Sequence, residues 1–97
     1  MSQSSISYKL VIPIEFEVIL EKLKIKKPDV FRDLGKKIEK VVKEPILGKP
    51  LRNTLRNYRR IHMDPFVLIY EIHMLEVRLI DFDHHDKIYK KYKFKYK

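Results

Sequence analysis

All four histidines of this 97-residue chain lie between positions 62 and 85, as His62, His73, His84 and His85. Imidazole changes its charge near neutral pH, so it is the side chain best suited to moving protons in a reaction at phosphate. Two segments, residues 59–70 and 84–89, mix three of these histidines with basic and apolar residues. In a strongly basic chain, this concentration of histidines predicts a small protein that handles RNA.

The positive charge of the chain is large and unevenly distributed. The formal net charge is +9, from 22 Lys and Arg against 13 Asp and Glu. Residues 49–60 carry no acidic group and five basic ones: Lys49, Arg52, Arg56, Arg59 and Arg60. Such a patch favours a polyanion or an acidic protein as partner. Charge alone does not separate ribosomal proteins, DNA-binding proteins and toxins.

Length and composition predict one globular domain over residues 1–97. The apolar fraction of 44% argues against disorder. No apolar run approaches the roughly 18 residues of a membrane-spanning helix, and residues 1–5 lack the basic and apolar regions of a secretion signal. Because the chain has no cysteine, it has no disulfide framework and no thiolate chemistry, and we expect a cytoplasmic protein.

The spacing of apolar residues predicts an α+β fold that positions the histidines. Residues 7–12 alternate as a strand that Pro13 ends, and residues 14–26 and 30–43 have mostly helical spacing, which predicts a helical hairpin. The period then becomes two, so strands are expected over 58–63, 66–73 and 75–82, joined by short links in an antiparallel meander. The tail, residues 90–97, alternates Lys with Tyr and Phe and is expected to be a short edge strand or a mobile arm.

Strand alternation assigns side chains to the two faces of the sheet. Ile61 and Met63 share one face, which we assign to the core beneath the helices. Arg60 and His62 then share the opposite, open face, which places a fixed cation beside a titratable group. In the next strand, Val67 is expected on or near the same open face.

The segment 81–86, Asp-Phe-Asp-His-His-Asp, holds side chains that commonly bind metals. Its spacing matches no compact ligand motif, and adjacent histidines usually point apart. We therefore expect no metal and no other cofactor. His73, at an expected hairpin, is predicted to be only exposed.

Four segments together resemble the RelE/ParE superfamily of small bacterial and archaeal toxins. They are Gly-Lys-Pro-Leu at 48–51, Leu-Arg-Asn-Tyr-Arg-Arg-Ile-His at 55–62, Val-Leu-Ile-Tyr-Glu-Ile at 67–72 and His-His-Asp-Lys-Ile-Tyr at 84–89. The resemblance covers nearly the whole chain and is greatest to the YafQ-like branch. In that branch a histidine precedes a proline-containing turn, and a second histidine comes four residues before a C-terminal aromatic residue.

The resemblance implies the toxin of a type II toxin–antitoxin system, a ribosome-dependent messenger-RNA endonuclease held inactive by a small, acidic, helical antitoxin. It implies that His62 and His85 are the active-site histidines, with the roles of acid and base left open. Tyr89 matches the aromatic residue that contacts a nucleotide, and Arg60 matches a catalytic position that contacts phosphate. Residues expected to bind RNA phosphates are Lys49, Arg52, Arg56 and Arg59, and further candidates are Asp64 and His84.

The sequence departs from the family pattern at two positions. RelE-type members usually carry an arginine where this chain has Val67, and YafQ-like members usually carry an Asp directly after the proline of the turn, where this chain has Phe66. Either change is expected to lower activity. The alternative function is a non-catalytic toxin that resembles ParE and inhibits DNA gyrase, which Val67 favours. A third, weaker alternative is a nucleic-acid-binding domain with no toxin role.

Overall fold

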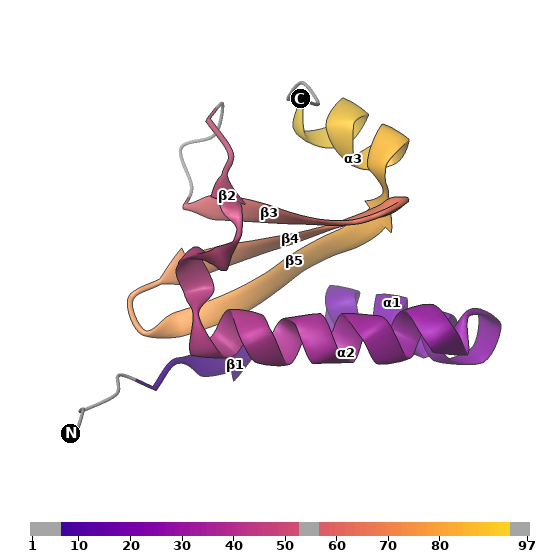
Figure 1. Ribbon diagram of the computed structural model, residues 1–97, viewed down its shortest axis with the longest axis horizontal. Helices are drawn as coiled ribbons and strands as arrows, with labels where there is room; N and C mark the ends of the chain where they lie inside the picture. The colour runs from indigo at the N-terminus through magenta and orange to yellow at the C-terminus, as the bar shows by residue number, and fades with distance from the viewer. Residues whose placement is uncertain (1–6, 53–56, 94–97) are drawn as a thin grey trace.

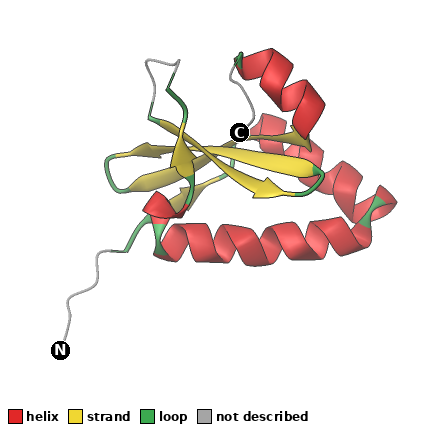
Figure 2. Ribbon diagram, turned by 45° about the horizontal axis from the view of Figure 1, so that its top comes forward, coloured by secondary structure: helices red, strands yellow, loops and turns green. Residues whose placement is uncertain are grey.

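Two helices cover one face of a five-stranded sheet, and a shorter third helix covers part of the other face (Figures 1 and 2). The computed structural model describes residues 7–52 and 57–93. The elements are β1 (Lys9–Val11), α1 (Ile14–Lys26), α2 (Pro28–Lys43), the 3₁₀ helix η1 (Pro45–Leu47), β2 (Lys49–Pro50), β3 (Tyr58–Met63), β4 (Phe66–His73), β5 (Glu76–His84) and α3 (His85–Tyr92). Within these residues, no helix is both long enough and apolar enough to cross a membrane.

The strand order in the sheet is β1-β5-β4-β3-β2. Strands β3, β4 and β5 form the expected antiparallel meander, and β1 pairs in parallel with β5 at one edge. The other edge is β2, which pairs with β3 in the antiparallel sense and was not predicted from the sequence. Two residues are too few to show an alternating pattern, so only the pairing with β3 reveals this strand.

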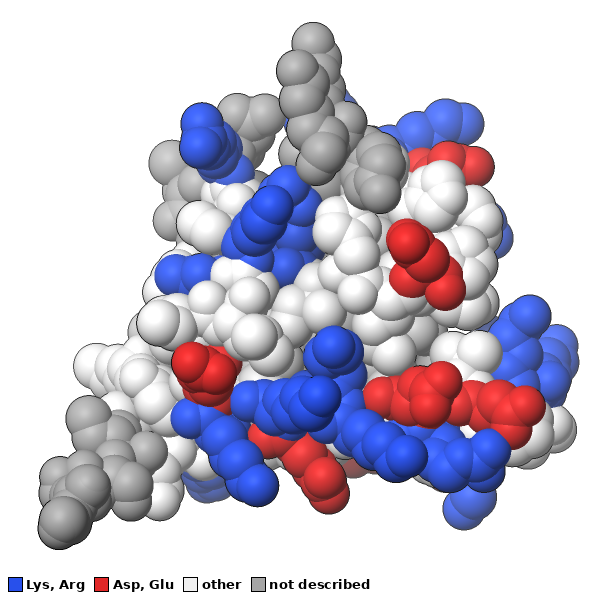
Figure 3. All heavy atoms as spheres, viewed as in Figure 1, with Lys and Arg blue, Asp and Glu red and all other residues white. Residues whose placement is uncertain are grey.

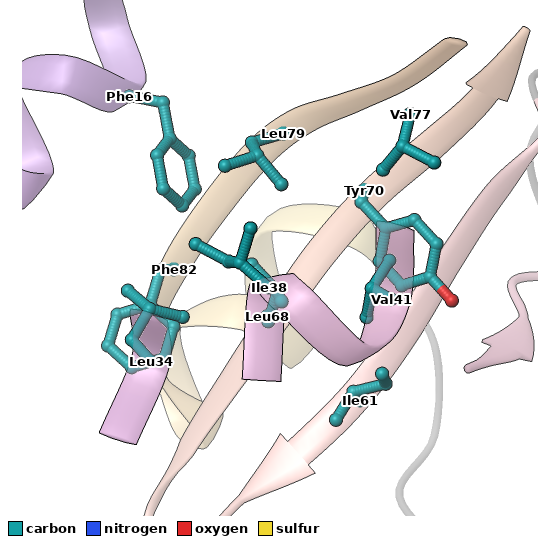
Figure 4. Packing of buried hydrophobic residues seen from close by; sticks show 10 residues of the cluster. All are labelled: Phe16, Leu34, Ile38, Val41, Ile61, Leu68, Tyr70, Val77, Leu79 and Phe82. Carbon is teal, nitrogen blue, oxygen red and sulfur yellow. The ribbon is translucent and has the colours of Figure 1, made fainter. Parts of the chain in front are cut away.

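The helical hairpin packs apolar residues of both helices on the meander, as expected (Figure 4). Helix α2 begins with Pro28, whose fixed φ suits the first helical position and whose missing N–H is not needed there. The core beneath the hairpin consists of Phe16, Leu34, Ile38, Val41, Ile61, Leu68, Tyr70, Val77, Leu79 and Phe82. Met63 packs against this cluster, so the assignment of Ile61 and Met63 to the helix side of the sheet is confirmed.

Residues 90–92 are helical, which corrects the expectation of an edge strand or a mobile arm for this part of the tail. Helix α3 runs to Tyr92, and residues 94–97 lie outside the described residues. Ile88 of α3 is fully buried between the helix and the sheet, in a second apolar cluster with Leu51, Val67 and Ile69. The helix forms because Ile88 and Tyr92, four residues apart, both face this cluster.

The sheet face that was expected to be open is therefore partly covered. Val67 lies on the predicted face, paired with His62 in the β3–β4 register. Its side chain is nevertheless fully buried in the cluster beneath α3. The prediction that Val67 lies on an open face was wrong, because strand alternation gives the face of a residue but not what packs on that face.

Tyr70 links the sheet to the segment that follows α2. Its hydroxyl donates a hydrogen bond to the Pro45 carbonyl (2.5 Å) and accepts one from the Gly48 N–H (2.9 Å). Burial raises the pKa of Tyr70 above its ordinary value. A Cβ atom at position 48 would lie 2.7 Å from this hydroxyl, so the close approach requires glycine.

We expect Tyr70→Phe to lower the free energy of unfolding by about 1–3 kcal/mol, because two buried backbone groups lose their partner. Urea denaturation followed by circular dichroism measures this change. The matched control is Tyr8→Phe, at a partly buried tyrosine that packs beside the core, with an expected change below about 0.5 kcal/mol. Equal destabilisation in both variants would contradict a special role for the Tyr70 hydroxyl.

Candidate active site

Three of the predicted site residues meet where the end of β3 approaches the start of α3. His85 and Tyr89 are four residues apart in α3, which places them on one side of the helix. Their ring centroids are 5.6 Å apart. The Tyr89 ring lies 6.3 Å from the His62 ring, and the Tyr89 hydroxyl is 3.4 Å from Nδ1 of His62. Tyr89 thus contacts both histidines.

The start of α3 is fixed by its neighbours in the sequence and in the sheet. β5 ends at His84 and α3 begins at His85, with no loop between them. Nδ1 of His84 accepts a hydrogen bond from the Asp86 N–H (3.2 Å), which caps the helix. The His85 N–H donates to the Pro65 carbonyl (2.9 Å), which ties the helix to the β3–β4 turn. His84 therefore serves the geometry of the helix start.

The other end of α3 is held by Asp81, which was not among the predicted site residues. The Asp81 side chain is almost fully buried, and its Oδ2 accepts hydrogen bonds from Lys91 Nζ (2.7 Å) and the Tyr92 hydroxyl (2.9 Å). Burial and the Asp81 charge raise the pKa of Tyr92. An acidic residue inside an apolar strand was the only sequence signal for this anchor. Helix α3, and with it His85 and Tyr89, is fixed at both ends.

Two cations lie on the same side of the sheet as His62. Arg60 precedes His62 by two positions in β3, so both side chains project from one face. Lys49 in β2 is the register partner of Arg60 and adds a second charge. Figure 3 shows Lys and Arg side chains gathered near the β2–β3 edge of the sheet.

The other predicted phosphate-binding residues are placed differently. Arg59 projects from the opposite face, where its Nη1 donates to the carbonyls of Gly48 (2.5 Å) and Ile46 (3.5 Å). Arg52 is exposed just after β2, and Arg56 lies outside the described residues. The structure thus brings Arg60 and Lys49 to the histidines but separates Arg59 from them.

The surroundings of His62 favour its neutral form. Its pKa lies below the ordinary value, mainly because the ring is partly buried, and then because of the charges on Arg60, Lys49 and His85. Asp64, exposed in the β3–β4 turn, opposes the shift and raises the pKa. A neutral imidazole at neutral pH can accept a proton, so this environment suits a general base.

One group among the described residues has the side chains of a metal site: His84, His85 and Asp86, whose ligand atoms lie within 4.8 Å of one another. Such a donor set suits a transition metal rather than magnesium. Nδ1 of His84 already accepts the Asp86 N–H, and Nδ1 of His85 lies 3.0 Å from Oδ1 of Asp86. These contacts orient the two rings, so the group has a structural use apart from any metal.

A pocket of about 360 Å³ lies between α2 and the β3–β4 turn. It is lined by Val30, Asp33, Met63, Asp64, Pro65 and Phe66. Met63 and Phe66 pack against the core under the helices, so this pocket opens on the helix side of the sheet. His62 instead projects from the opposite face, where Tyr89 of α3 approaches it.

A family model and two relatives each match most of this chain. A family model described as "ParE toxin of type II toxin-antitoxin system, parDE" matches residues 17–89, which include every site residue from Lys49 to Tyr89. A Methanocaldococcus jannaschii protein described as "Putative toxin RelE4" is 36% identical over 89 residues, covering 89% of this chain and 95% of its own length. A Methanosarcina mazei protein is 34% identical over 85 residues, covering 84% of this chain and 99% of its own.

The fold also occurs in a solved structure. This structure is the toxin–antitoxin complex RelBE2 from Mycobacterium tuberculosis, in which one chain superposes with a TM-score of 0.68. The superposition covers 86% of this chain and 97% of the other, at 22% sequence identity. At this identity the likeness establishes a shared fold, three helices with a mostly antiparallel sheet.

Proposed function

Because this chain belongs to the RelE/ParE superfamily of type II toxin–antitoxin toxins, we propose that it is a ribosome-dependent endoribonuclease that cleaves messenger RNA. The observation that carries the proposal is the meeting of His62, His85 and Tyr89 beside Arg60 and Lys49. Two imidazoles and two cations are the groups that phosphodiester cleavage needs when no metal takes part. The similarity of the histidine spacing to the YafQ-like branch supports the same proposal.

The proposed reaction uses the 2′-hydroxyl of the RNA itself as the nucleophile. His62, whose surroundings favour the neutral form, accepts the hydroxyl proton as the 2′-oxygen bonds to phosphorus. His85 donates a proton to the 5′-oxygen as the bond from phosphorus to that oxygen breaks. The products are a 2′,3′-cyclic phosphate and a 5′-hydroxyl. Arg60 and Lys49 stabilise the charged transition state, and Tyr89 holds a nucleotide by stacking.

A cognate antitoxin is the second part of the proposal. The structural neighbour is described as a toxin–antitoxin complex, and a small, acidic, helical antitoxin would match the net charge of +9. We expect acidic residues of the antitoxin to cover the basic patch around Lys49 and Arg60, and an amphipathic helix to pack on an apolar surface. The ribosome is expected to position the messenger RNA through rRNA contacts with the same basic patch.

A translation assay tests the activity. Purified protein is incubated with messenger RNA in the presence and absence of ribosomes, and cleavage sites are mapped by primer extension. We expect cleavage of the messenger RNA only in the presence of ribosomes. An intact message together with inhibition of DNA gyrase supercoiling would overturn the proposal in favour of a ParE-like toxin, which the buried Val67 favours.

The pH dependence of cleavage tests the assignment of His62 as the base. Its lowered pKa predicts that activity persists below pH 6.5 and is lost as His62 becomes protonated. Lys49→Gln removes a charge that lowers this pKa, so the acidic limb of the rate profile should move to higher pH. Asp64→Asn should move the limb to lower pH. NMR titration of the His62 ring measures both shifts directly, and shifts of the same sign in both variants would contradict the assignment.

A further inference from the structure

Helix α1 is apolar on two opposite sides. Its inner side packs against the core through Phe16, Ile19, Leu20 and Leu23. Its outer side carries Ile14, Val18 and Ile25, whose exposed fractions are 75%, 48% and 78%. A surface helix usually presents polar residues on the face opposite its core side. The outer side of α1 therefore has the character of a contact surface.

The outer apolar residues have the spacing of a helix–helix seam. Positions 14, 18, 21 and 25 are separated by four, three and four residues, which is the alternation of a heptad pattern. Three of these positions are Ile or Val, and the fourth is Glu21. The seam runs for about 16 Å along the helix axis. We name these four residues the α1 seam.

We propose that the α1 seam binds the α1 seam of a second copy of this chain, with the two helices antiparallel and related by a two-fold axis. In this arrangement Ile14 packs against Ile25 of the second copy, and Val18 packs beside its Glu21. A closed, symmetric pair buries the outer apolar side of α1 on both copies. His62 projects from the face of the sheet opposite α1, and His85 lies in α3 on that same side, so the pairing leaves the candidate active site open (Figure 1).

The charges that flank the seam are self-complementary. Glu15 and Glu17 flank its N-terminal half, and Lys22 and Lys24 flank its C-terminal half, all four exposed. In an antiparallel helix pair, each flanking heptad position faces the equivalent heptad position of the other helix. Glu15 therefore faces Lys22 of the second copy, and Glu17 faces its Lys24. Each contact occurs twice by symmetry.

The opposite, parallel arrangement is disfavoured by the same residues. It would place Glu21 directly against Glu21 of the second copy, and like charges in such positions repel. It would also align the two helix dipoles, which the antiparallel arrangement opposes. One helix pair falls below the roughly 1,200 Å² of a standard stable interface, so we expect a reversible dimer seen at about 10–100 μM protein.

Charge exchange at one flanking pair tests the interface. Sedimentation velocity from about 1 to 300 μM gives the dimer dissociation constant. Glu17→Lys and Lys24→Glu should each weaken the dimer at least about tenfold, because each creates two like-charge contacts. The double variant should return to within about threefold of the unchanged chain, because the pairs are restored with reversed sign. Thermal unfolding verifies that all three variants fold.

Several outcomes would overturn the proposal. The first is that the unchanged chain stays monomeric at all concentrations. The second is that the single variants dimerise as tightly as the unchanged chain, and the third is that the double variant dimerises no more tightly than the single variants. If the chain is monomeric and a cognate antitoxin instead binds less tightly to Ile25→Glu than to the unchanged chain, the α1 seam belongs to the antitoxin. RNA cleavage by Glu17→Lys should equal that of the unchanged chain, so failure of the interface and failure of the proposed activity are distinguishable.

Disulfide trapping tests the direction of the helices, because the chain has no cysteine of its own. A mixture of Ile14→Cys and Ile25→Cys proteins should form a mixed disulfide dimer under mild oxidation. Neither variant alone should form a disulfide dimer efficiently, because identical positions lie far apart in an antiparallel pair. Efficient dimers from Ile14→Cys alone would indicate parallel helices and would overturn the proposed arrangement.

Discussion

Replacing His85 by alanine is expected to reduce ribosome-dependent cleavage of messenger RNA by a factor of about 10²–10⁴, the usual contribution of a positioned general acid or base. His85 contacts Tyr89 from the first turn of α3, and Tyr89 in turn approaches His62. Loss of the imidazole removes the proposed proton donor for the leaving 5′-oxygen. His62→Ala should cause a loss of similar size, because it removes the proposed base. Single-turnover cleavage on programmed ribosomes measures both.

The neighbouring His84 offers a matched control. His84→Asn retains a side chain that can accept the Asp86 N–H at the start of α3 and removes the imidazole. Its activity should stay within about fivefold of the unchanged chain, because positioning at the helix start is kept. The double variant His62→Ala/His85→Ala should be little worse than either single, since residues that act as a unit are not additive. Full activity in His85→Ala would contradict the acid–base assignment.

Asp81→Ala is expected to lower both stability and cleavage, although Asp81 contacts no proposed reacting group. Its buried carboxylate accepts hydrogen bonds from the hydroxyl of Tyr92 and the ammonium group of Lys91. Removing it should lower the free energy of unfolding by about 1–3 kcal/mol, since the half-buried Tyr92 hydroxyl loses its partner. Helix α3 loses its C-terminal anchor, so His85 and Tyr89 are less well positioned and cleavage should fall by about tenfold or more.

Comparison with Lys91→Ala separates anchoring from a general loss of stability. The Lys91 side chain is 64% exposed, so its removal should change stability by less than about 1 kcal/mol. Hydrogen exchange should show faster opening of α3 in Asp81→Ala, with strands β3 and β4 unchanged. Equal protection of α3 in both variants would show that Asp81 does not anchor this helix. Cleavage by Lys91→Ala should stay near that of the unchanged chain.

The sequence determined the elements with strong periodicity. The helical hairpin, the meander and the placement of Ile61 opposite His62 all follow from the distribution of apolar residues, because burial of one face imposes the period of a helix or strand. The association of His62, His85 and Tyr89 came from a family resemblance rather than from periodicity. The spacing from His85 to Tyr89 is itself a helical spacing, but the Lys and aromatic alternation beyond it favoured a strand or an arm.

Only the tertiary structure decided what covers the second face of the sheet. A strand pattern shows which residues share a face, but packing across that face depends on contacts between residues far apart in the chain. Ile88 packs in one cluster with Val67 and Ile69. Because of this packing, residues 90–92 continue α3 where a strand or an arm was expected, and Val67 is buried at a position expected to be open. Asp81 became recognisable as an anchor only through Lys91 and Tyr92, because a buried carboxylate persists where folding supplies its hydrogen-bond donors.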